Sequence, residues 1–478
     1  MLPARTCPGP LSRRQWLSVG GISLGALATG GLPGLARLFA AESEAPQLSR
    51  DFSVILFWAN GGPSHIDIFD LKPQAPVEYR GPFRPIRTNV PGIEISELLP
   101  RLARCADKFA LLRSLHHERA EHSGGSHRFL TGYASKAANL KVSEYPDIGS
   151  IVAHQLAGQP SPVPPFVANT QSYGCGPGYL GPAYAPYMPS PNPLSASGAN
   201  TYDPVPLYRM PAQPADSITA QDNLSISADG VLTLRRREGL LKTLDRLPSK
   251  LDESGSMSAL DKFQERAVSM LASERTRLAF DLSRESEQTR ERYGETHWGR
   301  SLLTCRRLVE AGVRFVQCQA EFRLRPETGV TSSWDDHAVN CHIFQALEEK
   351  LPVLDQSVSA LVEDLSARGL DKHVLFLFCG EFGRTPRISY GKGIARPGRD
   401  HWPRAMSVFA AGGGLQMGQV IGATSSRAEE PTRRAMNSNC LLATIYHRFG
   451  IDTQTQLLDR SGRPLAILPS GEPIRELL

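Results

Sequence analysis

Three short apolar runs most constrain how this chain can fold. They span Phe52–Ala59, Val374–Cys379 and Met406–Ala411, and each passes directly into a polar or glycine-containing loop. A continuous apolar run of strand length is typical of a strand covered on both faces, as in parallel sheets with helices on either side. The runs therefore predict an open, mainly parallel α/β sheet whose strand carboxyl ends meet at a common crevice.

The segments between these runs fit the same architecture. Apolar residues at helical spacing predict a helix through Leu354–Leu365, with Gly369 as a C-terminal cap. Arg314–Cys318 follows a predicted helix at Leu302–Ala311 and is expected to be a further strand. With 41% hydrophobic and 21% charged residues, the chain can enclose a large core, which excludes a disordered, fibrous or coiled-coil protein.

Residues 1–41 are expected to be an export signal. Ser12-Arg13-Arg14-Gln15-Trp16-Leu17 precedes an uncharged apolar stretch that ends near Leu35, and this resembles a twin-arginine signal of bacteria. The many glycines, together with Pro33, make a permanent membrane anchor the weaker alternative. We expect export by the twin-arginine route to the periplasm or beyond, with an uncleaved signal as the way the protein would be retained. No span is expected in the mature chain.

The charge balance argues against nucleic acid as a partner. The chain has 53 Lys and Arg against 48 Asp and Glu, and four arginines but no acidic residue lie in the first 40 positions. The mature chain is therefore almost neutral, whereas duplex binding requires a concentrated basic face.

The mature chain is expected to be one domain over residues 51–478, with two departures from regular α/β alternation. Residues 158–215 are rich in Pro, Gly and Tyr and predict an irregular excursion, and residues 256–300 predict a helical insertion. The cysteines after Cys7 are scattered and contain no C-x-x-C pair, which argues against a disulfide framework and against a thiolate zinc site.

Histidines beside carboxylates are the strongest chemical signal. They occur at His65 and Asp67, at Asp336 and His337, and at Asp400 and His401, while Glu381 directly follows a predicted strand. Carboxylate oxygen and imidazole nitrogen together suit a divalent metal such as zinc, manganese or iron. The alternative is that each histidine caps a turn. Arg384 is expected either to neutralise a carboxylate or to clamp an anionic ester as a catalytic residue.

Five segments together carry a family resemblance: NGGPSHIDIFDLKP, WDDH, LPVLDQSVSALVEDLSARGL, GEFGRTP and GRDHWP, in this order. The chain resembles the bacterial exported family called domain of unknown function 1501, which is itself similar to the alkaline phosphatase and sulfatase superfamily. The resemblance implies an α/β/α sandwich with up to two metals. It places Asn60 where a metal-binding Asp is usual, Glu381 where Asp-His is usual, and His401 on a matching His; Asp336 and His337 would complete the set.

The nucleophile is the weakest part of this resemblance. His122–Gly132 is similar to the sulfatase stretch that carries a nucleophile ahead of Arg, here Arg128, but it contains no cysteine. Ser123 or Ser126 could serve, or His122 and His127 could be metal ligands instead. The alternative is a glycine-rich loop that packs under the sheet.

Two functions follow from these residues. The first is a metal-dependent hydrolase of phosphate or sulfate esters, acting on a small molecule or an exported polysaccharide. The second is a non-catalytic exported binding or assembly protein with a degenerate metal site, which the amide of Asn60 and the apolar Phe382 in ligand positions favour.

Overall fold

The structure is a computed structural model that describes residues 48–49, 51–159, 161–169, 172–188, 273–321, 333–391, 393 and 395–478. Residues 49–478 form one compact unit. The expected export signal at 1–41, the second half of the irregular excursion (189–215) and the first part of the helical insertion (256–272) lie outside the described residues.

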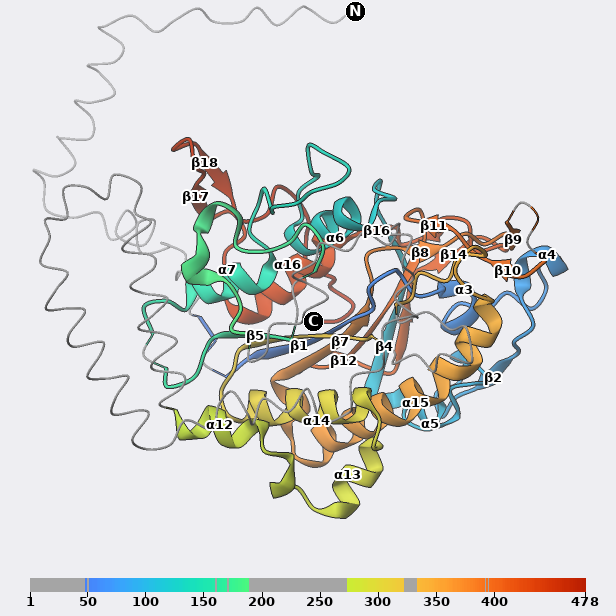
Figure 1. Ribbon diagram of the computed structural model, residues 1–478, viewed down its shortest axis with the longest axis horizontal. Helices are drawn as coiled ribbons and strands as arrows, with labels where there is room; N and C mark the ends of the chain where they lie inside the picture. The colour runs from blue at the N-terminus through green and yellow to red at the C-terminus, as the bar shows by residue number, and fades with distance from the viewer. Residues whose placement is uncertain are drawn as a thin grey trace, which may run out of the picture. The chain divides into compact units, whose positions relative to one another are not determined.

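A single large sheet is the centre of the fold (Figure 1). Its strands lie in the order β13 (Gln419–Ile421), β4 (Phe109–His116), β12 (Met406–Gly412), β7 (Val374–Cys379), β1 (Ser53–Trp58), β6 (Phe315–Gln319) and β5 (Phe166–Ala168), and β16 (Met436–Asn437) also pairs with β4. Every residue of β1 and β7 is buried, as their unbroken apolar sequences predict. The predicted strand at Arg314–Cys318 corresponds to β6.

The direction of β12 differs from the sequence prediction. β1 runs parallel to both β6 and β7, and Trp58 lies opposite Gln319 and Cys379, so these three strands end level with one another. β12, however, is antiparallel to both β7 and β4. Its beginning near Met406, and not its end, therefore lies beside the carboxyl ends of β1 and β7. An apolar run indicates that a strand is buried on both faces, but it does not indicate in which direction the strand runs. The predicted direction of β12 was wrong for this reason.

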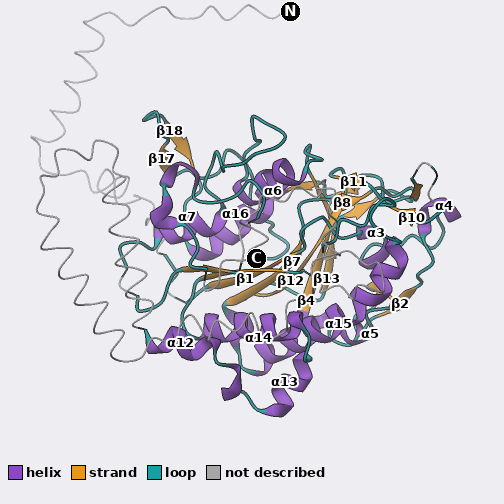
Figure 2. Ribbon diagram, viewed as in Figure 1, coloured by secondary structure: helices purple, strands orange, loops and turns teal. Residues whose placement is uncertain are grey.

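Helices cover both faces of the sheet (Figure 2). One face carries α6 (His122–Thr131), α7 (Ile148–Gln155) and α16 (Ser438–Phe449); the other carries α5 (Pro100–Ala103), α12 (Glu274–Phe280), α13 (Glu287–Tyr293), α14 (His297–Glu310) and α15 (Ile343–Ala367). α15 contains the predicted helix and ends as expected, because Gly369 adopts the left-handed conformation directly after the C-cap residue Arg368. The result is a mixed, mainly parallel sheet between two helical layers.

Short elements complete the described chain. They are α3 (His65–Ile68), α4 (Val77–Arg80) and five two-stranded pairs: β2 (Pro85–Arg87) with β3 (Glu94–Ser96), β8 (Gly383–Arg384) with β11 (His401–Trp402), β9 (Ser389–Tyr390) with β10 (Pro397–Gly398), β14 (Ala423–Thr424) with β15 (Pro431–Arg433), and β17 (Gln456–Leu458) with β18 (Pro464–Ala466). The described part of the excursion adds β5 to the sheet edge. Among the described residues, no helix combines the length and apolarity needed to cross a membrane.

Candidate metal centre

The candidate site lies where β1 and β7 end and β12 begins. Asn60 and Gly61 follow β1, Glu381 follows β7, Asp335 belongs to the segment after β6, and His401 lies in β11 just before β12. Gly61 has φ +103, and a Cβ there would lie 2.4 Å from the backbone nitrogen of Asp335. Only glycine combines this backbone conformation with so close an approach, which lets two chain segments distant in sequence meet at the site.

Asp335 is the centre of the cluster. Its Oδ1 lies 2.9 Å from His337 Nε2, 2.9 Å from His401 Nε2 and 2.6 Å from Arg384 Nη2, and its Oδ2 lies 3.4 Å from His122 Nε2. Burial raises the pKa of Asp335, but the Arg384 guanidinium and the surrounding histidines outweigh it and hold the pKa well below its usual range. Asp335 is therefore a carboxylate at neutral pH.

Three atoms that could bind a metal, Asp335 Oδ1, His337 Nε2 and His401 Nε2, form a nearly equilateral triangle. Besides the two contacts of Asp335 Oδ1, His337 Nε2 lies 3.0 Å from His401 Nε2. Ligands about 2.0–2.1 Å from one metal are about 2.9 Å apart at right angles and about 3.4 Å apart in a tetrahedron. The triangle thus has the dimensions of one face of a metal coordination shell.

The outer nitrogens of both histidines are engaged away from the triangle. His401 Nδ1 donates to the carbonyl of Ala120 at 2.7 Å, and His337 Nδ1 lies 2.7 Å from Asp400 Oδ1. Such contacts fix the tautomer and turn Nε2 toward a metal. Since a carbonyl can only accept, the neutral His401 ring presents the lone pair of Nε2 to a carboxylate oxygen. Although burial lowers the pKa of His337, its contacts with Asp335 and Asp400 raise it, so a protonated Nε2 can donate within the triangle. A divalent cation bound there would take the place of that proton.

A second group of atoms adjoins the triangle. His122 Nδ1 lies 2.7 Å from Glu381 Oε1, which also accepts the N–H of Gly61 at 2.8 Å. Although burial lowers the pKa of His122, its contacts with Asp335 and Glu381 raise it to about 9. Ligand atoms of His122, Asp335 and His401 lie within 4.8 Å of one another, so this trio could also hold a metal ion.

Two buried oxygens in this second group, Glu381 Oε2 and Asn60 Oδ1, make no hydrogen bond within the described part of the chain. His122 Nε2 makes the 3.4 Å contact with Asp335 Oδ2. A buried polar atom without a partner costs about 1–3 kcal/mol. The unpaired atoms therefore indicate a missing ligand, either an ion or water.

Three predicted ligands lie elsewhere. Asp67 forms a buried ion pair with Arg399, with contacts of 2.8 and 3.0 Å, and His65 Nε2 lies 2.9 Å from the carbonyl of Ala428. Asp336 accepts from Lys350 Nζ at 2.7 Å. α3 leads His65 and Asp67 away from the strand ends, and Asp336 faces a different partner from its neighbour Asp335. These residues support the surroundings of the cluster and do not contribute to it.

Of the other predicted ligands, the structure brings Asn60, His337, Glu381 and His401 together, while Asp400 contacts the cluster through His337. The WDDH segment predicts Asp336 at the site, whereas the structure places Asp335 there, and His122 is predicted only as an alternative ligand. The two adjacent aspartates of WDDH indicate that one of them lies at the site. Which of the two side chains faces the strand ends depends on tertiary contacts that the sequence does not show.

The predicted nucleophile stretch is a helix and not a loop. Its glycines allow close packing, since a Cβ on Gly125 would lie 3.1 Å from the Phe382 ring. Ser123 Oγ donates to the carbonyl of Ala138 and accepts the N–H of Leu140, both at 3.0 Å. Arg128 contacts Glu118 at 3.2 Å and the carbonyl of Gly132 at 2.9 Å. Both side chains are thus engaged in packing.

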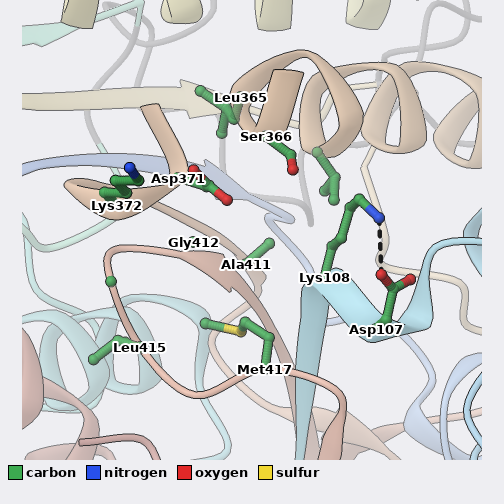
Figure 3. Close-up of a pocket in the computed structure, with 12 residues that line it drawn as sticks. Asp107, Lys108, Leu365, Ser366, Asp371, Lys372, Ala411, Gly412, Leu415 and Met417 are labelled. Carbon is green, nitrogen blue, oxygen red and sulfur yellow. Dashed lines mark hydrogen bonds and ion pairs between the residues drawn. The ribbon is translucent and has the colours of Figure 1, made fainter. Parts of the chain in front are cut away.

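A separate pocket of about 230 Å³ lies at the opposite edge of the sheet, where β12 ends (Figure 3). It is lined by residues that include Lys108, Asp107, Lys372 and Asp371, and Lys108 pairs with Asp107 at 2.8 Å. Because its lysines are matched by aspartates, no net charge selects a ligand there. None of the residues of the candidate metal centre lines this pocket.

Known proteins were compared with the chain at the level of sequence and of structure. No curated protein matches it. Similar solved structures include the PsFucS1 sulfatase from Pseudoalteromonas sp., at 11% identity and TM-score 0.34, covering 88% of this chain and 72% of that one. The phosphonate monoester hydrolase SpPMH from Silicibacter pomeroyi is 10% identical at TM-score 0.38, covering 89% of this chain and 76% of that one.

A third similar structure is Ps i-CgsB in complex with k-i-k-neocarrahexaose, at 10% identity and TM-score 0.37, covering 84% of this chain and 73% of that one. At these scores the chemistry of the chain has to be argued from its own residues. The sequence match is of a different kind, because it extends from residue 51 to residue 478 without leaving out any of the segments that carry the cluster. The chain therefore belongs to the family described as "Protein of unknown function (DUF1501)".

Proposed function

We propose that this protein is a metal-dependent hydrolase of phosphate or sulfate esters. The observation that carries the proposal is the triangle of Asp335 Oδ1, His337 Nε2 and His401 Nε2, three potential metal ligands that lie 2.9–3.0 Å apart. Their types suit a divalent metal such as zinc, manganese or iron, and their spacing is that of ligands at right angles around one ion. A metal bound there would polarise an ester oxygen and acidify a water molecule.

The remaining residues have separate roles in this proposal. Glu381 and Asn60 present buried oxygens without hydrogen bonds toward the same edge and could bind a second cation or orient water. His122 Nε2 is placed to bind an ester oxygen or to give it a proton. Since Ser123 is engaged by the backbone of the 138–140 segment, we infer that water and not this serine attacks the ester.

The test is metal content and ester hydrolysis in a matched pair of variants. Protein purified after native export is assayed for bound metal and for turnover of aryl phosphate and aryl sulfate esters. Asp335→Asn should lose both, whereas Asp336→Asn should only lower stability, because its carboxylate serves Lys350 and not the triangle. Equal metal content in wild type and Asp335→Asn would contradict the proposed site.

The second candidate is a non-catalytic exported binding or assembly protein. It is favoured by the engagement of Ser123 and by the complete burial of Arg384, which leaves neither side chain free to contact a substrate. Wild-type protein that retains metal but is inactive toward both ester classes across a panel of divalent ions would support this candidate.

We also propose that residues 1–41 direct export by the twin-arginine route. The proposal rests on the paired Arg13 and Arg14 ahead of an uncharged apolar stretch. Replacing both arginines with lysine should retain the protein in the cytoplasm. Unchanged export of that variant would contradict the assignment.

A further inference from the structure

Arg384 is a fully buried arginine, and each of its three side-chain nitrogens donates within the protein. Nε donates to the carbonyl of Gly62 at 3.0 Å, Nη1 to the carbonyl of Arg399 at 3.0 Å, and Nη2 to Asp335 Oδ1 at 2.6 Å. Nη2 also contacts the carbonyls of Gly61 and Trp334. Because the guanidinium is fully buried and each of its nitrogens is engaged within the protein, the geometry favours the neutralising role over the catalytic one.

These contacts join three segments that are far apart in sequence. Gly61 and Gly62 follow β1, Trp334 and Asp335 lie after β6, and Arg399 precedes β11. Each segment supplies part of the cluster or stands next to it. A guanidinium is suited to this position, because it is planar, permanently charged and able to donate in several fixed directions at once.

The arginine approaches Asp335 at the same oxygen that faces the two histidines. Three side chains thus contact Oδ1: the Arg384 guanidinium and the imidazoles of His337 and His401. Without the guanidinium, the Asp335 carboxylate would be buried beside Glu381 with only histidines to offset its charge. It would then be free to rotate away from the triangle.

We propose that Arg384 is a positioning residue that holds Asp335 Oδ1 in the metal-binding orientation before a metal enters. This inference rests on the proposed function and specifies how its site is preorganised. Arg384 acts through Asp335 and touches neither metal nor substrate. Loss of an outer partner of a metal ligand typically reduces metal affinity by about 10–100-fold.

The experiment compares two buried arginines. Arg384→Lys keeps the positive charge but removes the planar guanidinium that donates in several directions. The control, Arg306→Lys, makes the same change at an arginine that is 1% exposed and pairs with Glu285 and Glu310 in the helical layer. Zinc affinity of the metal-free protein is measured by competition with a chelator, and thermal stability by calorimetry. Cobalt-loaded protein then reports the ligand geometry through its visible spectrum.

We expect Arg384→Lys to lower zinc affinity at least tenfold and to change the cobalt spectrum. Arg306→Lys should lower the melting temperature while zinc affinity stays within twofold of wild type. A folded Arg384→Lys variant with unchanged affinity and spectrum would overturn the inference. Wild-type protein that binds no divalent metal would instead overturn the proposed function, so the two failures are distinguishable.

A measurement on the wild type keeps the inference testable if Arg384→Lys does not fold. Crystal structures of the metal-free and zinc-loaded protein should both retain the contact between Arg384 Nη2 and Asp335 Oδ1. A carboxylate that contacts Arg384 in only one of these two states would contradict preorganisation.

Discussion

Two buried clusters of charge in this protein differ in how their groups are matched. In the helical layer, Arg306 pairs with Glu285, Glu310 and Asp364 at 2.7, 2.6 and 3.2 Å, so that each cationic group faces an anionic one. At the strand ends, carboxylate oxygens and imidazole nitrogens lie close together, and two buried oxygens, Glu381 Oε2 and Asn60 Oδ1, have no hydrogen-bond partner among the described residues. Arg306 is surrounded by carboxylates that offset its charge, whereas the second cluster offers a set of atoms that could bind a cation. This difference in charge matching is enough to assign a structural role to the Arg306 cluster and a ligand-binding role to the strand-end cluster, without comparison to other proteins.

The largest effect on metal binding is expected from removing one of the three side chains that form the triangle. His401→Ala should abolish stoichiometric metal binding and any ester hydrolysis while the fold survives, because the site lies at strand ends and not in the core. Elemental analysis of the exported protein measures this. The matched control is His65→Ala, a buried histidine outside the cluster, which should retain metal. Full metal content in His401→Ala would place the metal elsewhere.

Disrupting the helical cluster should have the opposite pattern. Arg306→Met leaves buried carboxylates without their counter-charge and should reduce the free energy of unfolding by about 3–5 kcal/mol. Metal content should not change. Denaturant unfolding and metal analysis on the same samples would test both statements. A variant that loses metal without losing stability would contradict the assignment of Arg306 to a purely structural cluster.

Two histidines on α6 allow the comparison to be made within one helix. Burial lowers the pKa of His127 to about 4, whereas His122, in contact with Asp335 and Glu381, has its pKa raised to about 9. Since the unfolded state takes up a proton at about pH 6.5 and folded His127 does not, its stabilising contribution is complete above that pH. It is lost as the pH falls from 6.5 to about 4, by about 3 kcal/mol in total.

Unfolding free energies of wild type and His127→Gln, measured from pH 7 to pH 4, give this contribution as the difference between the two slopes. Parallel profiles would show that the pKa of His127 is the same in the folded and unfolded states, which would contradict the prediction.

A smaller effect is expected at Glu381. Glu381→Gln keeps the shape of the side chain but removes the charge next to His122, and should weaken metal binding about tenfold, or about 1.4 kcal/mol. Titration of metal-free protein with zinc measures it. An unchanged affinity would restrict the metal to the triangle and leave Glu381 as a partner of His122 alone.

The smallest effect is expected at Ser123. Ser123→Ala removes one hydroxyl that bridges Ala138 and Leu140, and should cost about 1 kcal/mol of stability with turnover within about twofold of wild type. Loss of turnover at unchanged metal content would restore Ser123 as the nucleophile.

The sequence predicts the sheet better than the site, and for a physical reason. Continuous apolar runs identify β1, β7 and β12 because burial on both faces is a local property of the sequence, and β6 is predicted from its position after a helix. The orientation of β12 is not local, since it is set by pairing with β4 and β7. The same holds for the adjacent aspartates of WDDH. Arg384 and Lys350 decide which of them joins the cluster, and neither interaction is visible in the spacing.

The hairpin formed by β8 and β11 ties two functional positions to one another. His401 lies directly opposite Arg384 in this antiparallel pair, so that both side chains project from the same side of the ribbon toward Asp335. A slip of one residue in the pairing would turn one of them away. Insertions and deletions between the GRTP and HWP segments should therefore be tolerated only where they leave the pairing of Gly383–Arg384 with His401–Trp402 unchanged.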